Sequence, residues 1–208
     1  MKSRERIVIV LVLVLMIVGP PCVAGAEDGT VLGNLATAFD RESNSRERYI
    51  GFIDLANEER QKSIASLYRA VAASKSVQLR NYRELINSLG GTAKTKWQKY
   101  AELQSLKSQL EYALNEESFK CEKMYPTLMG PAEVAGNANI MLAFYFARAI
   151  AEVHAALFRE TLNNRETWKR DRVDYRFCPV CGNTVRGKPE FGKCPFCGTP
   201  AMSYLTVN

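Results

Sequence analysis

Two Cys-x-x-Cys motifs near the end of this 208-residue chain have the residue types and spacing of a metal site. The motifs supply four thiols, Cys178, Cys181, Cys194 and Cys197, and twelve residues separate the second from the third. Four thiolates at this spacing predict a tetrahedral site for Fe or Zn, in a module too small to fold on its own apolar core. Gly182 and Gly198 follow the motifs and permit the turns that such a site needs. The alternative is a pair of disulfides in an exported protein.

The N-terminus has the pattern of a secretory signal peptide covering residues 1–26. Basic residues precede an uncharged apolar run from Ile7 to Val18, which ends at Gly19-Pro20-Pro21. Ala24-Gly25-Ala26 then provides a small-x-small cleavage site. The run is shorter than the roughly 20 residues of a membrane-spanning helix. We therefore predict export to the periplasm or outside the cell without stable membrane insertion, and an uncleaved anchor is the alternative.

The charge balance does not indicate a nucleic-acid partner. The formal net charge is +6, and removal of residues 1–26 takes away three basic groups and one acidic group, which leaves +4. No long block of like charges stands out, so no nucleic-acid binding is predicted. The mature chain would keep five cysteines. Cys121 is left over from the two motifs, and we expect it to be a buried free thiol.

The middle of the chain predicts a bundle of four helices. Apolar residues recur at steps of three and four between residues 33 and 163, which is typical of helices packed side by side. Breaks at Gly90-Gly91 and from Pro126 to Gly136 divide the region. The predicted helices cover about 33–57, 61–88, 101–128 and 137–163. Residues 164–175 are polar and predict a linker to the cysteine module at 176–208, which we expect to be built of short strands and loops.

The predicted helices carry polar groups in the middle of their apolar faces. These groups are Glu42, Lys75, Gln78, Glu117, Lys120 and His154. A buried charge costs several kcal/mol unless it is paired or bound to a metal. Polar groups at a similar height on all four helices therefore predict a polar centre inside the bundle. For His154 alone, a core histidine bonded to a neighbouring acid is the simpler interpretation.

The sequence from about Asn34 to Leu205 resembles the rubrerythrin family. The resemblance depends on Asn34-Leu35-x-x-Ala38-Phe39 with Glu42 and Tyr49, on Glu117 followed by Met124-Tyr125-Pro126, on Gly136 and on the two cysteine motifs. It implies a ferritin-like four-helix domain followed by a rubredoxin-like domain. It also implies two irons held by carboxylates and histidine in the bundle, peroxide reduction there, and electron delivery through the rubredoxin-type iron. A homodimer is implied, with the cysteine module of one chain near the bundle of the other.

Transferring the family's iron ligands residue by residue leaves the di-iron site incomplete. Four candidate ligands are retained: Glu42, Glu59, Glu117 and His154. Five positions are substituted: Lys75, Gln78, Lys120, Ala135 and Ala151. The tyrosines expected beside the site, Tyr49 and Tyr125, are present.

The two lysines suggest that the chain supplies the positive charge that iron would otherwise provide. A protonated ammonium group cannot ligate iron and repels it. Three carboxylates against Lys75 and Lys120 leave one negative charge, which protonation of His154 would balance. The alternatives are a single metal on the four retained ligands and a working di-iron site, which we consider the less favoured.

Three functions follow from this sequence. The first is an exported electron-transfer or redox-sensing protein with one rubredoxin-type iron bound by four cysteines and an unknown redox partner. The second is a peroxidase of rubrerythrin type. The third is a non-catalytic scaffold that is stabilised by Zn and uses the bundle for dimerisation or partner binding.

Overall fold

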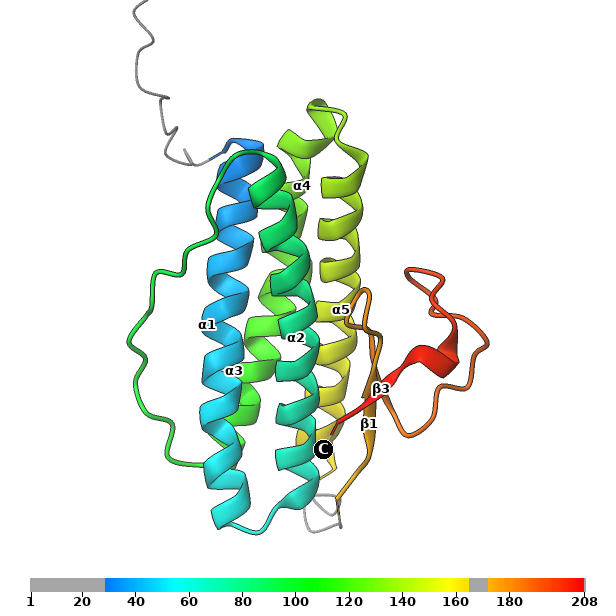
Figure 1. Ribbon diagram of the computed structural model, residues 1–208. Coiled ribbons are helices and arrows are strands. Elements are labelled where there is room, and N and C mark those ends of the chain that lie inside the picture. Colours follow the sequence, from blue (N-terminus) through cyan, green and yellow to red (C-terminus); the bar gives the residue numbers. More distant parts are fainter. Residues whose placement is uncertain (1–28, 165–171, 208) are drawn as a thin grey trace, which may run out of the picture.

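Four long helical stretches form an elongated bundle, and a small sheet lies against one side of it (Figure 1). The computed structural model describes residues 29–164 and 172–207. The helices are α1 (Val31–Glu58), α2 (Lys62–Ser88), α3 (Leu106–Phe119), the π-helical segment η1 (Lys120–Met124), α4 (Tyr125–Val134) and α5 (Ala138–Asn163). The four-helix prediction is confirmed. The predicted signal peptide and much of the predicted linker lie outside the described residues.

Polar side chains fix where three of the helices begin. Thr30 accepts a hydrogen bond from the Gly33 amide at 2.9 Å, Ser105 from Ser108 at 3.1 Å, and Asn137 from Ile140 at 3.2 Å. Each bond satisfies an amide that has no partner within its own helix. The third helix therefore begins at Leu106, and the predicted start at residue 101 is wrong.

The third helical stretch also continues past the prolines at which the sequence predicted its end. The Tyr125 amide bonds to the carbonyl of Lys120, five residues back, as in a π-helical turn. This wider turn comes directly before Pro126, whose ring would crowd an ordinary α-helical turn. The stretch then runs through Pro131 to Val134. Gly136, which has a positive φ of 64°, follows the end of the helix.

An extended segment, which we call the strap (residues 91–105), runs along the outer side of α1 and connects α2 to α3 (Figure 1). Three α1 side chains one turn apart bond its backbone. Asp40 accepts from the Lys96 amide at 2.5 Å, and Asn44 both accepts from the Gln98 amide at 2.9 Å and donates to the Lys96 carbonyl at 3.1 Å. Arg48 donates to the Ala101 carbonyl at 3.0 Å. Side chains of α1 thus provide hydrogen bonds for backbone amides and carbonyls of the strap, which pairs with no strand among the described residues.

Two apolar clusters fill the bundle on either side of a polar middle. One contains Leu35, Phe39 and Phe144, and the other contains Tyr49, Leu67 and Phe158. Burial of such side chains is the main driving force for bundle folding. The clusters therefore hold the helices in place around the charged groups described below.

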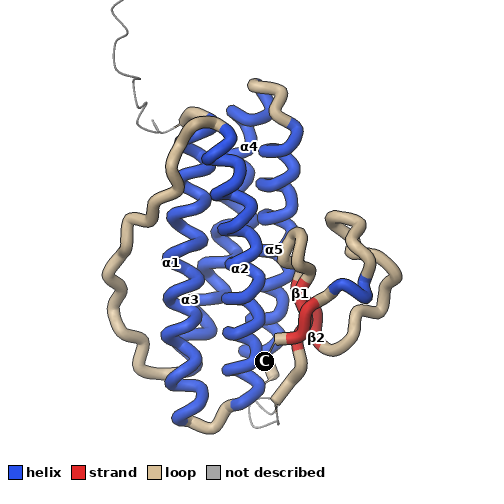
Figure 2. The backbone as a smooth tube through the Cα atoms, viewed as in Figure 1, coloured by secondary structure: helices blue, strands red, loops and turns tan. Residues whose placement is uncertain are grey.

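The C-terminal module contains a three-stranded antiparallel sheet in the order β2-β1-β3 (Figure 2). The strands are β1 (Tyr175–Phe177), β2 (Thr184–Arg186) and β3 (Leu205–Thr206). Ile150 of α5 shares an apolar cluster with the motif cysteines Cys178, Cys181 and Cys194. The module therefore packs directly on the bundle of its own chain.

Candidate metal centres

The four cysteines of the two motifs converge on one point in the C-terminal module. Their sulfur atoms all lie within 4.8 Å of one another. The Cys178–Cys197 and Cys181–Cys194 sulfur pairs are 3.5 and 3.6 Å apart. Metal–sulfur bonds of about 2.3 Å in a tetrahedral site imply sulfur separations close to these. All five described cysteines are free thiols, so the geometry fits one Fe or Zn rather than two disulfides.

Equivalent turns position the two halves of this four-cysteine site. The Gly182 amide donates to the Cys178 carbonyl at 2.9 Å, and the Gly198 amide donates to the Cys194 carbonyl at 3.0 Å. The two glycines have positive φ values of 89° and 73°. Glycine adopts this conformation without a steric penalty, as the sequence predicted.

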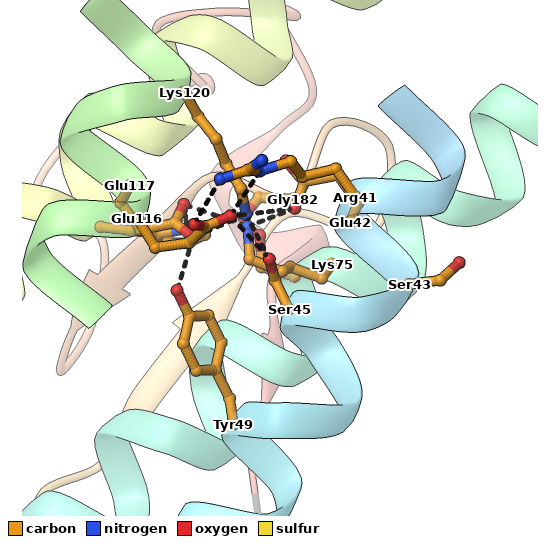
Figure 3. Close-up of polar contacts among 12 residues, drawn as sticks. Arg41, Glu42, Ser43, Ser45, Tyr49, Lys75, Glu116, Glu117, Lys120 and Gly182 are labelled. Atoms are coloured by element: carbon orange, nitrogen blue, oxygen red, sulfur yellow. Dashed lines mark hydrogen bonds and ion pairs between the residues drawn. The ribbon is translucent and has the colours of Figure 1, made fainter. Parts of the chain in front are cut away.

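Two carboxylates and two ammonium groups meet at the centre of the bundle (Figure 3). Lys75 Nζ lies 2.6 Å from Glu42 Oε2 and 3.0 Å from Glu117 Oε2. Lys120 Nζ lies 2.9 Å from Glu42 Oε2 and 3.0 Å from Glu117 Oε1. All four side chains are 0% exposed. Each lysine therefore bridges both carboxylates, and the charges of this set, which we call the ion-pair core, cancel.

Tyrosine hydroxyl groups add hydrogen bonds to both carboxylates of the ion-pair core. Tyr125 donates to Glu42 Oε1 at 2.6 Å, and Tyr49 donates to Glu117 Oε1 at 2.8 Å. Tyr82 donates to the Tyr125 hydroxyl at 3.1 Å. Buried carboxylates need such partners because water cannot reach them. The two tyrosines predicted beside the site thus do contact its carboxylates.

A second ion pair borders the core on the side of α1. Arg41 donates to both oxygens of Glu116 at 2.8 Å, which is a bidentate arrangement. Ser45 accepts a bond from Lys120 at 2.8 Å and donates to Glu116 at 3.2 Å. This pair is also neutral overall. Sequence reasoning did not identify these three residues, although Arg41 and Ser45 both lie within one turn of Glu42.

The lysines hold both core carboxylates in the ionised form. Burial alone would raise the pKa of Glu42 and of Glu117, but Lys120 and Lys75 outweigh it. The pKa of Glu42 is therefore lowered and that of Glu117 lies well below its usual range. Burial opposes the charge of Lys120, and the neighbouring carboxylates more than offset this effect, so the pKa of Lys120 is raised. Glu42, Glu117 and Lys120 are therefore charged at neutral pH.

His154 lies against the same core. Its Nδ1 lies 3.4 Å from Glu117 Oε2, at the outer limit of a hydrogen bond. Burial lowers the pKa of His154 below 6.5, although Glu117 acts in the opposite direction. The core therefore does not need a protonated His154 for its charge balance. Two lysines already balance two carboxylates.

Comparison with known proteins shows the family to which this chain belongs. The profile of the rubrerythrin family matches residues 33–162, which is more than half of the chain. The chain belongs to the rubrerythrin family. The relatives it resembles include nigerythrin from Nitratidesulfovibrio vulgaris, which is 26% identical over 176 residues covering 85% of this chain and 86% of nigerythrin. Rubrerythrin-2 from Clostridium acetobutylicum is 24% identical over 166 residues, covering 79% of this chain and 89% of that protein.

Solved structures give the same relationship across both parts of the chain. Nigerythrin in its fully reduced, all-ferrous state has a TM-score of 0.78 at 26% identity, and the match covers 86% of this chain and 88% of that structure. A bacterioferritin from Desulfovibrio desulfuricans matches with a TM-score of 0.62 at 16% identity, covering 67% of this chain and 81% of that one. The second match supports the fold alone. The predicted combination of a ferritin-like bundle with a rubredoxin-like four-cysteine region is confirmed.

Seven of the nine positions aligned with rubrerythrin ligands are buried in the bundle. They are Glu42, Lys75, Gln78, Glu117, Lys120, Ala151 and His154, all buried. Glu59 is exposed, because it lies one residue beyond the end of α1, where its amide caps the helix on Leu55. Ala135 is also exposed, at the end of α4. The predictions that placed Glu59 and Ala135 at the bundle centre are wrong.

Gln78 is the one substituted polar position that is left without hydrogen bonds. It is 4% exposed, and neither its amide nitrogen nor its amide oxygen has a partner among the described residues. Ala151, another substituted position, has only a methyl side chain and belongs to the apolar cluster that contains Phe144. Neither side chain replaces a ligand.

Hydrogen bonds connect the cysteine module to the bundle at the turn after Cys181. Ser74 of α2 donates to the Gly182 carbonyl at 2.5 Å, and Thr184 donates to the same oxygen at 3.1 Å. Thr184 Oγ1 also lies 3.1 Å from Nε2 of His154. His154 therefore contacts the ion-pair core through one ring nitrogen and the module through the other.

Further along α2, two side chains bond the first cysteine motif. Arg80 donates to the Pro179 carbonyl at 2.7 Å and Asn81 donates to the Val180 carbonyl at 2.8 Å. Sequence reasoning missed these contacts. Ser74 and Asn81 are two helical turns apart and therefore share a face of α2. This shared face was the one sequence feature that could have indicated a contact with the module. The sequence did not indicate that the module covers this face.

Proposed function

We propose that this protein is an electron carrier whose single redox centre is one iron bound by Cys178, Cys181, Cys194 and Cys197, and that its bundle holds no di-iron site. The position of the two lysine ammonium groups, each 2.6 to 3.0 Å from both buried carboxylates, carries the proposal. The family relationship supports a redox role.

The residues of the bundle centre do not fit a di-iron cofactor. The oxygens that would bind metal already accept hydrogen bonds from Lys75, Lys120 and two tyrosines. The pKa of Lys120 is raised, so this group keeps its proton and cannot ligate. Bringing a dication beside two buried ammonium groups would add repulsion at low dielectric. We therefore assign the centre a structural role.

The donor set of the four-cysteine site fits a resident metal, and the rubrerythrin context favours iron over zinc. When bound, such an iron supplies one-electron transfer. The chain's own residues hold the site. Ser74, Arg80 and Asn81 fix the first motif on α2, and three of the four cysteines are buried. Cys197 is the least buried of the four, so we propose that the unknown redox partner approaches from its side.

Metal analysis of the purified protein tests this assignment. We expect one iron per chain, a visible absorption that bleaches on reduction, and no peroxide turnover. The Cys194→Ser variant is expected to lose its iron, whereas the matched Cys121→Ser variant keeps it because Cys121 lies in the bundle. Three irons per chain or sustained peroxide turnover would overturn the proposal. Zinc alone in the native protein would instead support the scaffold role.

We also propose that the protein is exported and forms a homodimer. The N-terminal pattern of residues 1–26 supports export, and the family resemblance supports the dimer. Mass spectrometry of the native protein is expected to show a chain that begins at Glu27. An intact Met1 on membrane-bound material would favour the anchored alternative. Light scattering of the purified protein measures the oligomeric state.

A further inference from the structure

The two cysteine motifs differ in the side chains that surround their sulfur atoms. In the second motif, Thr199 Oγ1 lies 3.1 Å from the Cys197 sulfur, and the Tyr204 hydroxyl is hydrogen-bonded to the Cys194 sulfur. Among the described residues, no hydroxyl group is hydrogen-bonded to the sulfur atoms of the first motif. Side-chain hydroxyl groups therefore act on one half of the four-cysteine site.

The Tyr204 hydroxyl is held in place by a second hydrogen bond. Its oxygen accepts from the side-chain amide nitrogen of Asn183 at 2.9 Å, and both side chains are buried. The Phe191 ring packs edge-on against the Tyr204 ring, with the ring centroids 5.6 Å apart. A buried hydroxyl proton needs an acceptor, and the Cys194 sulfur, in the same apolar cluster, is the acceptor that Tyr204 has among the described residues. Asn183 therefore orients the Tyr204 proton toward Cys194.

Thr199 is fixed beside the second motif by its own backbone. Its carbonyl accepts a hydrogen bond from the Cys194 amide at 2.7 Å. A cysteine that binds a metal is a thiolate and has no proton to donate, so the hydroxyl is the donor in the contact between Thr199 and Cys197. Tyr204 is buried, whereas Thr199 and Cys197 are partly exposed. Water can therefore replace the Thr199 hydroxyl but not the Tyr204 hydroxyl.

We propose that Tyr204 and Thr199 set the reduction potential of the four-cysteine site through their hydrogen bonds to Cys194 and Cys197, and that Asn183 is a positioning residue for Tyr204. The inference rests on the proposed function, because it requires iron in this site. Neither hydroxyl group gives up its proton. The effect is therefore on the equilibrium between two oxidation states, and no proton is transferred.

The direction of the effect follows from the charge of the site. Reduction by a one-electron donor converts Fe(III) to Fe(II) and adds one negative charge to the iron and its four thiolates. A hydrogen bond is stronger when its acceptor carries more negative charge. The bonds from Tyr204 and Thr199 therefore stabilise the reduced form more than the oxidised form, and they raise the reduction potential.

A redox titration of the purified protein, followed by visible absorption, tests the proposal. At the potential where the wild type is half reduced, we expect Tyr204→Phe to raise the ratio of oxidised to reduced protein about tenfold, which is about 59 mV for a one-electron couple. Thr199→Val should shift the ratio in the same direction by a smaller factor, because water replaces the hydroxyl there. Tyr175→Phe is the matched control. It removes a buried hydroxyl of β1 that is hydrogen-bonded to Arg186, and it should leave the ratio unchanged.

A double-variant comparison tests the role of Asn183. Asn183→Leu removes the side-chain donor at similar volume and should raise the ratio of oxidised to reduced protein in the wild-type background. The same substitution should leave the ratio unchanged in the Tyr204→Phe background, because Asn183 acts through Tyr204. Equal effects in the two backgrounds would overturn the positioning role.

Elemental analysis of each protein separates this inference from the proposed function. A wild type without iron would overturn the proposed function and this inference together. An unchanged ratio in iron-loaded Tyr204→Phe would overturn this inference alone and leave the electron-carrier assignment in place. Loss of iron from Tyr204→Phe, with iron retained in Tyr175→Phe, would show that the Tyr204 hydroxyl holds the site together and would also overturn its role in setting the potential.

Discussion

At the scale of single residues, the ion-pair core depends on each lysine contacting both carboxylates. Lys75 and Lys120 come from different helical stretches, and each lies within 3.0 Å of Glu42 and of Glu117. No charge in this set can be removed without leaving another one buried and unbalanced. Such cores are strongly destabilised by the loss of one member, even where a fully apolar replacement would be tolerated.

We predict that Lys75→Met lowers the free energy of unfolding by about 3–5 kcal/mol, because it leaves one net negative charge in the core. Urea denaturation followed by helical circular dichroism measures the change. Lys107→Met is the control, since Lys107 forms an exposed pair with Glu111, and it should change stability by less than about 1 kcal/mol. Adding Glu117→Gln to Lys75→Met is expected to recover part of the loss. A double variant that simply sums the two single losses would contradict the bridged arrangement.

We also predict that stability falls with decreasing pH in two stages. His154 is the single histidine, and burial lowers its pKa, so the unfolded chain takes up a proton first below pH 6.5 and stability declines. Below about pH 4.5 the unfolded chain also protonates before Glu42 and Glu117, whose pKa values are lowered in the folded state. Each group contributes about 1.4 kcal/mol for every unit by which its two pKa values differ.

Urea denaturation of the bundle at a series of pH values tests this prediction. The His154→Gln variant should lack the first stage and keep the second. Loss of metal from the cysteine module is followed separately by visible absorption. A first stage that persists in His154→Gln would show that another group causes it.

The residues of the bundle centre were predictable from sequence only as far as helical periodicity extended. Glu42, Lys75, Glu117, Lys120 and His154 all lie in the middle of apolar faces, and the structure brings them together. Glu59 and Ala135 were assigned by alignment with a family pattern across helix ends. Nothing in the apolar periodicity supported them, and both are exposed.

At the scale of elements, one glycine controls how closely the cysteine module approaches the bundle. A Cβ atom on Gly182 would lie 2.7 Å from the Ser74 hydroxyl oxygen and 2.9 Å from the Ser74 carbonyl oxygen. The corresponding glycine of the second motif, Gly198, has a similar positive φ but nothing within 4 Å of its Cβ position. The two turns are thus alike in conformation and different in surroundings.

We predict that Gly182→Ala separates the module from α2, whereas Gly198→Ala does not. Both variants have the same conformational strain, so the difference between them isolates the steric contact with Ser74. Hydrogen exchange is the measurement. Amides of residues 175–186 should exchange at least tenfold faster in Gly182→Ala than in Gly198→Ala. Equal exchange in the two variants would contradict the close approach of module and helix.

The boundaries of elements were the least predictable part of the fold. The third helical stretch continues through Pro126 because a π-helical turn precedes it, and hydrophobic periodicity cannot signal such a turn. Hydrophobic periodicity predicted that the helix begins near residue 101, but residues 101–105 belong to the strap. The strap backbone is instead bonded by α1 side chains that lie about 50 residues away in sequence, and local patterns do not report such contacts.

At the scale of the whole molecule, the bundle has the fold of the rubrerythrin family, and two lysines pair with two carboxylates at its centre. Two apolar clusters and the tyrosines around the carboxylates are in place, while lysine, glutamine and alanine stand at buried positions that the resemblance aligns with ligands. The arrangement of backbones does not depend on the identity of the central cation, provided that the charge is balanced. It should therefore be possible to replace the lysines and their neighbours by metal ligands without changing the fold.

We predict that Lys75→Glu, Gln78→His, Lys120→Glu and Ala151→Glu together restore iron binding to the bundle. All four positions are buried, and Lys75 and Lys120 contact Glu42 and Glu117 directly. Elemental analysis should show more iron per chain than in the wild type. Without iron the variant should be less stable than the wild type, because its carboxylates would repel one another. Adding Ala135→Glu should bring no further iron, since that position is exposed. Iron content unchanged by the four substitutions would show that these positions cannot form a ligand set.

The lysines of the ion-pair core have a consequence for the life of the protein when iron is scarce. A bundle that depends on iron would accumulate in such conditions as an apoprotein with facing carboxylates, exposed to loosening and proteolysis. On the proposed assignment, this bundle carries its central cations in its own sequence, so its folding does not require iron. Under the proposed function, starvation for iron would then affect only the cysteine module. The amount of folded protein and the fraction that can carry electrons would become independent quantities.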